Sequence, residues 1–480
     1  MGTKFEGLEP KKVFGFFEKL TDIPRSSGNE GAVADLLVDF ADRRGLIAYR
    51  DDHNNVTILK PATSGMEDKE TVILQAHMDM VCVKDDGIDS NPDKDPIDAY
   101  VDGDLIKARG TSLGADDGIG IALILAVLDS DDISHPMIEA IFTADEEVGL
   151  GGANGYDVSR LKGKRFINMD TEEENHIVTG CAGGCRCTLS SKCKNGKVEG
   201  SIYEITISGL AGGHSGTDID KGSANANVLM GRLLLLASQN AEFNLGTYEG
   251  GTKDNAICAS AQATVVVKKK NGKAFEKAVK SFTESIVSEY GKTDPGLKIK
   301  CKDKDKGKLE VMSTKDTLKF IQVLNLMPNG VAKMSQISDI VETSSNIGVV
   351  NAKPKSYNIG VSLRSNRNAS LDWMISKIEM LAALLNVQMS TTGRYPAWES
   401  DADSPLADKA TELYRSMFGK EIRKVAIHAG LECAVFSKKL KGVDMISIGP
   451  DITSAHSTSE SLSISSTKRE WDFLLELLKL

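Results

Sequence analysis

Hydrophobic positions in the first part of the chain switch repeatedly between a helical and a strand-like spacing. Apolar residues recur every three to four positions over 11–20 and 30–44, whereas 55–59 and 71–78 are short apolar runs typical of buried strands. A glycine-rich turn at 110–118, an apolar helix ending at 128, and strands at 138–143 and 166–169 follow. This alternation predicts an α/β sheet, and its polar clusters come directly after strands, where open sheets bind ligands.

From about residue 200 the pattern becomes strand, helix, strand, strand, helix, strand. The expected elements are 202–207, 224–238, the strands near 256–267, 274–290 and 297–302. A similar order recurs more weakly at 308–312, 315–326, 346–350, 356–363, 371–385 and 387–391. We predict an inserted α+β module of the ferredoxin-like type, and the recurrence indicates that the module is duplicated. The α/β pattern returns after 396, so the first domain is expected to comprise 1–195 and 396–480, interrupted by an inserted domain at 196–395.

Length, charge and cysteine content narrow the class of protein. A chain of 480 residues is long enough for two cores, and a net charge of −10 disfavours binding to nucleic acid. The longest apolar stretch, 119–128, is half of the roughly 20 residues that span a bilayer, so we expect no membrane association. The N-terminus lacks a signal peptide, and eight dispersed cysteines suit reduced thiols. We therefore expect a cytoplasmic protein.

Acidic and histidine side chains follow several of the predicted strands. They are His77 and Asp79, the pair Asp116–Asp117, the pair Glu146–Glu147, Asp170 and His456. His77 and Asp79 are two positions apart at a strand end, so their side chains point to the same face. A metal-bound imidazole commonly donates its second N–H group to a carboxylate. We therefore assign His77 as a metal ligand and Asp79 as its supporting residue.

Adjacent carboxylates repel each other unless cations lie close by, so the two acidic pairs imply bound positive charge. The charge of two Zn²⁺ ions would be balanced by Asp116, Glu147 and Asp170 together with one bridging hydroxide. This arrangement leaves Glu146 available as a base. The cluster Cys181, Cys185, Cys187 and Cys193 is glycine-rich and then alternates like a strand, which departs from the usual spacing of zinc ligands.

The order HMD, GADD, DEE, a single D and a late HS resembles the co-catalytic zinc peptidases that include peptidase T, peptidase V, carnosinases and carboxypeptidase G. Several longer stretches, spread over essentially the whole chain, resemble one subfamily, the aminoacyl-histidine (Xaa-His) dipeptidases. These stretches are IPRSSGNE, ILQAHMDMV, SLGADDGIGIA, TADEEVGLGGA, GGHSG, RYPAW and HAGLEC. The chain has HSTSE at its late histidine, where relatives are expected to have HSPDE.

The resemblance implies a mixed-sheet zinc-peptidase catalytic domain with an inserted lid, and it assigns the metal site residue by residue. Asp116 would bridge two divalent ions, with His77 and Asp170 completing one site and Glu147 and His456 the other. Glu146 would be the general base, and the Asp116–Asp117 peptide bond would be cis. Zinc is the favoured metal, and cobalt or manganese would also suit these ligands.

The resemblance also assigns residues that bind substrate, most of them in the inserted domain. His214 corresponds to the lid histidine that reaches the scissile carbonyl oxygen, and it acts either in its own chain or in a partner's site. Asn255, Arg364 and the backbone around Gly430 would bind the C-terminal carboxylate of the substrate. His428 is interpreted as structural or adjacent to substrate. The resemblance also favours a homodimer joined through the inserted domains.

The predicted reaction is hydrolysis of a short peptide, of the Xaa-His type such as carnosine, by water held between the two metal ions. A tripeptidase, an aminoacylase or a carboxypeptidase of the same fold remains an alternative. A serine hydrolase is disfavoured because the chain has no G-x-S-x-G motif. A metal-binding scaffold without catalysis is a further alternative, against which the retained Glu146 argues.

Overall fold

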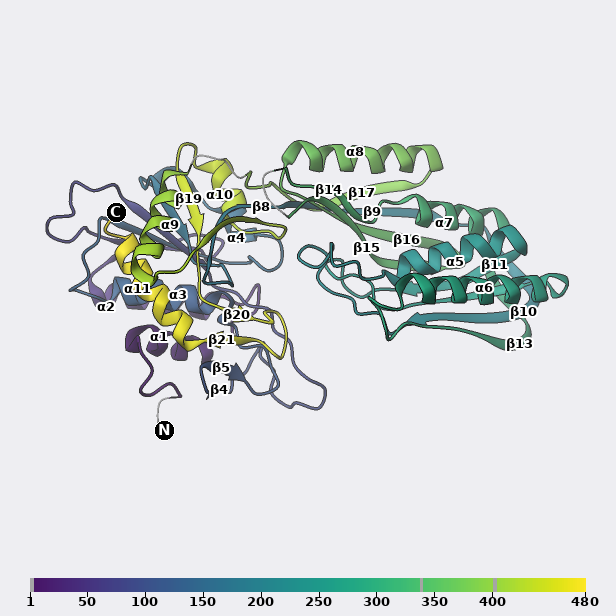
Figure 1. The fold of residues 1–480 in the computed structure, drawn as a ribbon, viewed down its shortest axis with the longest axis horizontal. Coiled ribbons are helices and arrows are strands. Elements are labelled where there is room, and N and C mark those ends of the chain that lie inside the picture. Colours follow the sequence, from purple (N-terminus) through teal and green to yellow (C-terminus); the bar gives the residue numbers. More distant parts are fainter. Residues whose placement is uncertain (1–3, 337–339, 400–403) are drawn as a thin grey trace. The chain divides into compact units, whose positions relative to one another are not determined.

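The computed structural model describes residues 4–336, 340–399 and 404–480, and the chain divides into two compact units (Figure 1). Unit 1 comprises Met1–Cys181, Trp398–Ala426 and Leu431–Leu480. Unit 2 comprises Ala182–Ala397 together with the short segment Ile427–Gly430. One unit is therefore interrupted in sequence by the other.

Unit 1 is built on an eight-stranded mixed sheet with the order β1-β2-β6-β3-β7-β19-β8-β18. Its central strands β6 (Ile138–Thr143), β3 (Val72–His77), β7 (Arg165–Asn168) and β19 (Asp444–Ser447) are parallel. The flanking strands are β1 (Ile47–Arg50), β2 (Val56–Lys60), β8 (His176–Cys181) and β18 (Arg423–Ile427). Because the central strands run in one direction, the segments after β3, β6 and β7 emerge at the same edge of the sheet.

The main core of unit 1 lies between this sheet and a group of helices. These are α1 (Lys11–Thr21), α2 (Gly31–Arg44), α3 (Ala115–Leu128), α9 (Pro405–Phe418) and α11 (Ile464–Leu477). Every residue of α3 is buried, which explains why its sequence is apolar on all sides. Alternation along β7 places Ile167 in this core and directs Phe166 to Phe436 of α10 (Cys433–Lys439), with ring centroids 5.1 Å apart.

Smaller elements complete unit 1. The short helix α4 (Gly151–Gly155) contacts α10, and a 3₁₀ turn covers Val158–Arg160. A separate four-stranded sheet has the order β20-β21-β5-β4. Its strands are β4 (Ala99–Asp102), β5 (Leu105–Ala108), β20 (Ile452–Thr453) and β21 (Ser461–Ser463). The loop between β20 and β21 carries His456.

Unit 2 contains two modules with the same topology, one nested inside the other. The inner module is β10 (Asn195–Ser208), α5 (Ala226–Asn240), β11 (Phe243–Gly250), β12 (Ala261–Val267), α6 (Gly272–Tyr290) and β13 (Lys298–Met312). The outer module is β9 (Gly183–Lys192), α7 (Thr314–Leu326), β15 (Val341–Lys353), β16 (Ser356–Ser365), α8 (Asn368–Leu385) and β17 (Gln388–Tyr395). In each module the fourth strand lies beside the first, then the third, then the second, which is the ferredoxin-like order.

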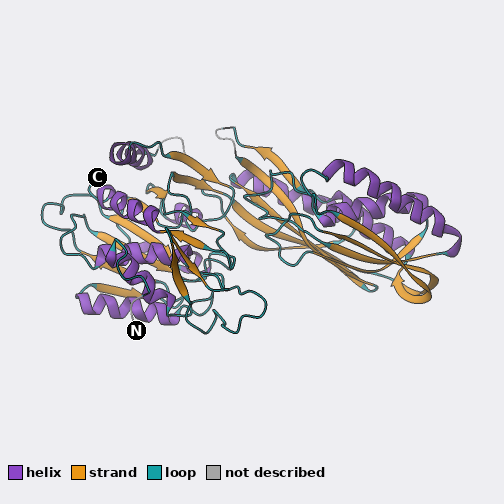
Figure 2. Cartoon of the chain, turned by 60° about the horizontal axis from the view of Figure 1, so that its bottom comes forward, coloured by secondary structure: helices purple, strands orange, loops and turns teal. Residues whose placement is uncertain are grey.

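The two modules form one sheet because β11 pairs with β15, and the short strand β14 (Gly330–Met334) adds to β15. Within unit 2 the helices lie on one face of this sheet (Figure 2). Adjacent helices also contact each other in the order α6, α5, α7, α8. Unit 2 therefore has a single continuous core made by both modules.

The structure differs from the sequence-based expectation in where the second module begins. Residues 308–312, expected as its first strand, are the end of the long strand β13, and the first strand of the outer module is β9. β9 pairs with β16 and β17, which come much later in the chain, so no local pattern indicates its partners. The unit boundary consequently lies after Cys181, not at residue 195. No helix among the described residues is long and apolar enough to cross a bilayer.

Candidate functional site

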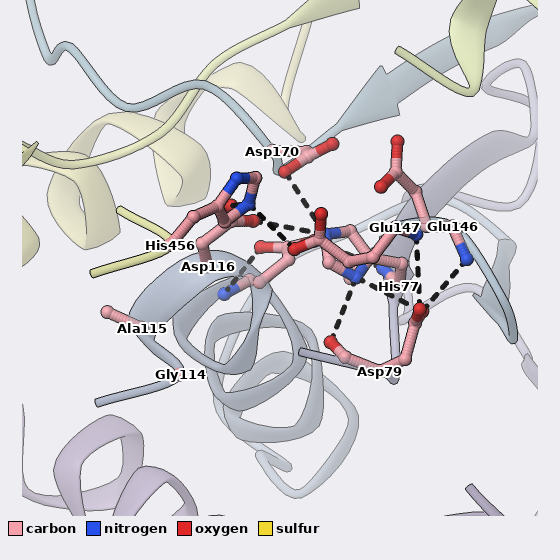
Figure 3. A network of polar contacts seen from close by, with 12 residues as sticks. His77, Asp79, Gly114, Ala115, Asp116, Glu146, Glu147, Asp170 and His456 are labelled. Carbon is pink, nitrogen blue, oxygen red and sulfur yellow. Dashed lines mark hydrogen bonds and ion pairs between the residues drawn. The ribbon is translucent and has the colours of Figure 1, made fainter. Parts of the chain in front are cut away.

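Five side chains predicted as metal ligands converge at the carboxyl edge of the unit 1 sheet (Figure 3). Their positions follow from the fold, since three of them end or follow parallel strands, one begins α3 and one lies in the β20–β21 loop. They form two triads that share one member, His77 with Asp116 and Asp170, and Asp116 with Glu147 and His456. Within each triad the potential ligand atoms lie within 4.8 Å of one another.

Asp116 lies between the two histidines and presents a different oxygen to each. Its Oδ1 is 3.0 Å from Nε2 of His77, and its Oδ2 is 3.0 Å from Nε2 of His456. Asp170 Oδ1 is 3.5 Å from the same His77 nitrogen, and Glu147 Oε1 is 2.8 Å from the His456 nitrogen. This is the arrangement expected of one carboxylate shared by two cations.

The electrostatics of the cluster fit a pair of divalent cations. Burial raises the pKa of Asp170 to about 7 and, together with neighbouring acids, raises the pKa of Glu146 well above its usual range. Burial alone would lower the pKa of His456, but the carboxylates of Asp116 and Glu147 raise it to about 11. Carboxylate oxygens and imidazole nitrogens are the donors that Zn²⁺ binds. The residues therefore fit the metal pair that the resemblance implies.

Asp79 supports this cluster in two ways. Nδ1 of His77 lies 3.1 Å from the backbone oxygen of Asp79 and 3.5 Å from its carboxylate, so Nδ1 carries the proton and Nε2 is the available ligand atom. The Asp79 carboxylate also accepts the backbone N–H groups of Glu146 and Glu147 at 3.0 and 3.1 Å. The second role was not expected from the sequence, where Asp79 was assigned only to His77.

Within each acidic pair, the two neighbouring residues make different contacts. Glu146 belongs to neither ligand triad that contains Asp116, but it forms a third group with His77 and Glu147 whose potential ligand atoms also lie within 4.8 Å of one another. Asp117 accepts the backbone N–H of His77 at 3.1 Å and that of Gly120 at 3.2 Å, which ties the end of β3 to the start of α3. The Asp116–Asp117 peptide bond is cis, which confirms the expectation from the resemblance.

Three buried charged residues around the site received no role from the sequence. Glu432 is fully buried and accepts hydrogen bonds from Gln75 Nε2 at 2.6 Å and Thr143 Oγ1 at 2.5 Å, and burial raises its pKa to about 8. Arg25 and Glu460 contact the backbone of the ligand-bearing segments. Glu432 and Arg25 lie in stretches that carry the resemblance, HAGLEC and IPRSSGNE, whereas Glu460 ends the HSTSE segment, where the chain departs from the sequence expected of relatives.

The residues predicted to bind substrate come together within unit 2. Nη2 of Arg364, at the end of β16, lies 3.3 Å from Nε2 of His214, which comes from the inner module. The loop of His214 pairs with the loop of Asn255, since the Ser215 N–H donates to the Asn255 carbonyl at 2.8 Å. Gly430 packs so closely on Tyr395 that an added Cβ would lie 3.0 Å from its ring.

Arg364 has the features of an anion-binding group. It is 9% exposed, its Nη1 donates to Tyr395 Oη at 3.2 Å, and its Nε has no hydrogen-bond partner among the described residues. No carboxylate in the described part of the chain forms an ion pair with it, so a buried cation stands without a counter-charge. Such an arrangement favours binding of a carboxylate.

His428 is held as a neutral, structural side chain. Its Nε2 accepts a hydrogen bond from the Ser344 hydroxyl at 2.7 Å, and its Nδ1 lies 3.0 Å from Asn366 Oδ1. Burial, with the nearby charge of Arg364, lowers its pKa to about 3. This environment agrees with the expectation that His428 is structural or adjacent to substrate and no metal ligand.

Comparison with known proteins gives a peptidase family, in agreement with the resemblance found in the sequence. Residues 73–480 match the family described as Peptidase family M20/M25/M40. The chain is 38% identical to the cytosol non-specific dipeptidase of Escherichia coli over 477 residues, covering 98% of both proteins. It also resembles the structure of aminoacylhistidine dipeptidase from Vibrio alginolyticus, with a TM-score of 0.84, 36% identity, and coverage of 99% of this chain and 97% of that chain.

A more distant likeness concerns the fold alone. A tripeptidase from Staphylococcus aureus has a TM-score of 0.56 at 15% identity, with coverage of 98% of each chain. The extent of the family match and the identity to the Escherichia coli protein settle the classification. The chain belongs to peptidase family M20/M25/M40.

Proposed function

We propose that this chain, a dipeptidase of the M20 family, hydrolyses Xaa-His dipeptides such as carnosine with the help of two divalent metal ions. The observation that carries the proposal is the position of Asp116, whose two carboxylate oxygens each face a different histidine at 3.0 Å. The name of the Vibrio alginolyticus relative, aminoacylhistidine dipeptidase, supports the preference for a C-terminal histidine.

In this proposal His77 and Asp170 would hold one ion, Glu147 and His456 would hold the other, and Asp116 would be shared by both sites. Zinc is the favoured ion because mixed imidazole and carboxylate ligands suit it. When bound, the two ions would polarise the scissile carbonyl and lower the pKa of the attacking water. Asp79 keeps the proton on Nδ1 of His77 and so leaves Nε2 free to bind the metal.

Glu146 is assigned as the general base and then the general acid. Its carboxylate takes the proton of the attacking water and passes it to the nitrogen of the departing amino acid. Burial and the neighbouring acids raise its pKa, and the charge of two bound cations would act in the opposite direction. The bond from its backbone N–H to Asp79 fixes the segment from which the side chain extends.

Unit 2 supplies groups that recognise the substrate. Arg364 binds the C-terminal carboxylate, with Asn255 and the backbone at Gly430 as further donors, and His214 donates to the carbonyl oxygen under attack. His214 belongs to the inner module and Arg364 to the outer module of the same chain, and they lie 3.3 Å apart. We therefore propose that His214 acts together with the Arg364 of its own chain.

A substrate panel tests this function. Dipeptides, tripeptides and N-acylated amino acids are assayed with metal-free protein and with the same protein after Zn²⁺ is restored. We expect Xaa-His dipeptides to be cleaved fastest, and only after the metal is restored. Faster cleavage of tripeptides or N-acylated amino acids would identify a different peptidase of this fold, and zinc binding without hydrolysis of any substrate would support a scaffold.

Replacing Arg364 with methionine is expected to raise KM for dipeptides by about 10–100-fold, because charge-assisted hydrogen bonds to a carboxylate contribute about 1.5–3 kcal/mol. The matched control is Arg232→Met, which removes an exposed arginine of unit 2 that pairs with Glu289 on the surface. Steady-state kinetics on free and C-terminally amidated dipeptides measure the effect. If Arg364→Met raises KM equally for the amidated substrate, the arginine does not bind the carboxylate.

We also propose a homodimer joined through unit 2. Trp373, Met380 and Leu384 are 56%, 64% and 80% exposed, and their spacing on α8 places them on one face of the helix. Exposed apolar stripes of this kind are typical of protein interfaces. Sedimentation of the double variant Met380→Lys, Leu384→Lys should give a monomer from a dimeric parent. A monomeric parent protein would rule the dimer out.

A cytoplasmic location is part of the same proposal. The Escherichia coli relative is named a cytosol dipeptidase, and all eight cysteines of this chain are free thiols. Cys181 ends β8 while Cys185 and Cys187 lie in β9, in agreement with their interpretation as strand residues. Unpaired cysteines are typical of proteins kept in a reducing compartment.

A further inference from the structure

The carboxylate of Glu460 is surrounded by backbone N–H groups at the start of α3. Its Oε2 accepts the N–H groups of Leu113 and Gly114 at 2.8 and 2.9 Å, and its Oε1 accepts those of Ala115 and Asp116 at 2.8 and 3.3 Å. The side chain is 3% exposed. A buried carboxylate at a helix N-terminus is favoured by these unsatisfied donors and by the helix dipole. One acid therefore fixes four consecutive peptide groups, the last of which belongs to Asp116.

Glu460 also lies on the loop of His456, directly before β21. The imidazole and the acid are four positions apart, and the loop between them includes a bond from the Glu460 N–H to the Ser457 carbonyl at 3.3 Å. The side chain of Glu460 consequently connects the backbone that carries His456 to the backbone that carries Asp116. These are two of the three residues in the second triad.

Arg25 makes the corresponding connection to the first triad. Its Nη1 donates to the backbone oxygens of Met78 and Asp79 at 2.8 and 2.9 Å, immediately after His77, and its Nη2 donates to the backbone oxygen of Gly114. The guanidinium is 2% exposed. Arg25 therefore ties the end of β3 to the turn that precedes Asp116.

Gly114 is held from both sides by these two residues. Its N–H group donates to Glu460 and its carbonyl accepts from Arg25. The residue has a φ of +71°, and a Cβ there would lie 2.7 Å from Nη2 of Arg25 and 2.5 Å from Sδ of Met80. Only glycine fits this peptide between the two charges, which explains the glycine in GADD.

We propose that Glu460 and Arg25 are positioning residues that together set the spacing of the two metal-binding triads without contacting either metal. Asp116 must present one oxygen to each site, so a shift of its backbone would weaken both. His77, Asp116 and His456 come from segments far apart in sequence, and the two buried charges link all three segments. This inference rests on the proposed two-metal function.

A different result is expected if Glu460 and Arg25 only stabilise the fold and do not position the metal ligands. If Glu460 and Arg25 only stabilised unit 1, their loss would lower the melting temperature but leave the metal affinity of the folded protein unchanged. If they position the ligands, their loss lowers the metal affinity and alters the ligand geometry in molecules that remain folded. Metal affinity and the visible spectrum of the cobalt-substituted protein separate these cases.

The test is Glu460→Gln, which preserves the shape of the side chain but removes its charge and replaces one acceptor oxygen by a donor. We expect the Zn²⁺ affinity of at least one site to fall by about 10–100-fold, the effect typical of losing a group that orients metal ligands. The Co²⁺ spectrum should change, and kcat should fall by more than KM rises. Arg25→Lys, which keeps the charge but not the forked donors, is the second variant and should weaken binding in the same direction.

The matched control is Glu470→Gln on α11. Glu470 is also a buried acid of unit 1, 1% exposed, but the charges that act on it are those of Glu174 and Asp451 and not those of the two triads. This control should leave Zn²⁺ affinity unchanged. Unchanged affinity and an unchanged Co²⁺ spectrum in Glu460→Gln, or equal losses in the control, would overturn the inference. A parent protein that binds no metal would instead refute the proposed function.

Discussion

Replacing Glu146 with glutamine is expected to lower kcat for Xaa-His dipeptides by about 10²–10⁴-fold, the usual contribution of a general base. Both metal ions should remain bound, because Glu146 belongs to neither of the triads that share Asp116. The amide keeps the size of the side chain but cannot accept the proton from water. KM should change little, since the groups assigned to substrate binding are untouched. Steady-state kinetics combined with metal analysis of the same preparation measure both quantities.

A suitable control is Glu173→Gln, an exposed glutamate of unit 1 that pairs with His176 at 2.8 Å. It makes the same chemical change outside the metal cluster and should leave kcat unchanged. If Glu146→Gln binds two metal ions and still hydrolyses dipeptides at the parent rate, Glu146 is not the base. If it loses a metal ion, Glu146 is a ligand and the two triads are wrongly divided.

The second large effect is expected at Asp116. Asp116→Ala should reduce the zinc content from two ions per chain to less than one and abolish measurable hydrolysis, because Asp116 is the only member common to both of its triads. His456→Ala, by contrast, removes a ligand from one triad and should lower the content only towards one ion. Titration with a zinc indicator gives these numbers, and circular dichroism establishes that each variant is folded.

The difference in metal content between the two variants tests whether Asp116 is shared by both metal sites. Equal losses of metal from Asp116→Ala and His456→Ala would mean that Asp116 is not shared between the sites. Loss of a single ion from Asp116→Ala with the other site intact would likewise contradict a bridging role.

The convergence of these acids and histidines could be predicted in large part from the sequence, because their placement follows from simple strand rules. His77 ends a parallel strand, and Glu147 and Asp170 follow two others, so the sheet itself brings them to one edge. His456 comes from far away in sequence, and it was placed by the resemblance. The pairing of Asp79 with two backbone N–H groups was missed because such bonds depend on loop conformation, which residue spacing does not specify.

The same reason explains why the sequence alone does not indicate a role for Glu460 and Arg25. Their partners are peptide groups, which every residue has, so no residue type in the sequence marks the partner. Burial of an acid or an arginine becomes informative only once the fold shows what surrounds it. In HSTSE the histidine is recognisable as a possible metal ligand. The glutamate at the end of the segment instead accepts hydrogen bonds from backbone N–H groups of the turn that leads into Asp116.

In unit 2 the two repeated patterns were visible from the sequence, but their nesting was not. β9 alternates like any edge or inner strand, and its neighbours β16 and β17 are separated from it by the whole inner module. Local periodicity therefore assigned the first strand of the second module to residues that extend β13. Long-range strand pairing is what hydrophobic spacing alone cannot specify.

The most direct test of the proposed two-metal site is the position of metal in the zinc-loaded protein, measured by anomalous X-ray diffraction at the zinc edge. We expect two ions per chain, one bound by His77, Asp116 and Asp170 and the other by Asp116, Glu147 and His456. A single ion, or two ions that do not share Asp116, would contradict this expectation.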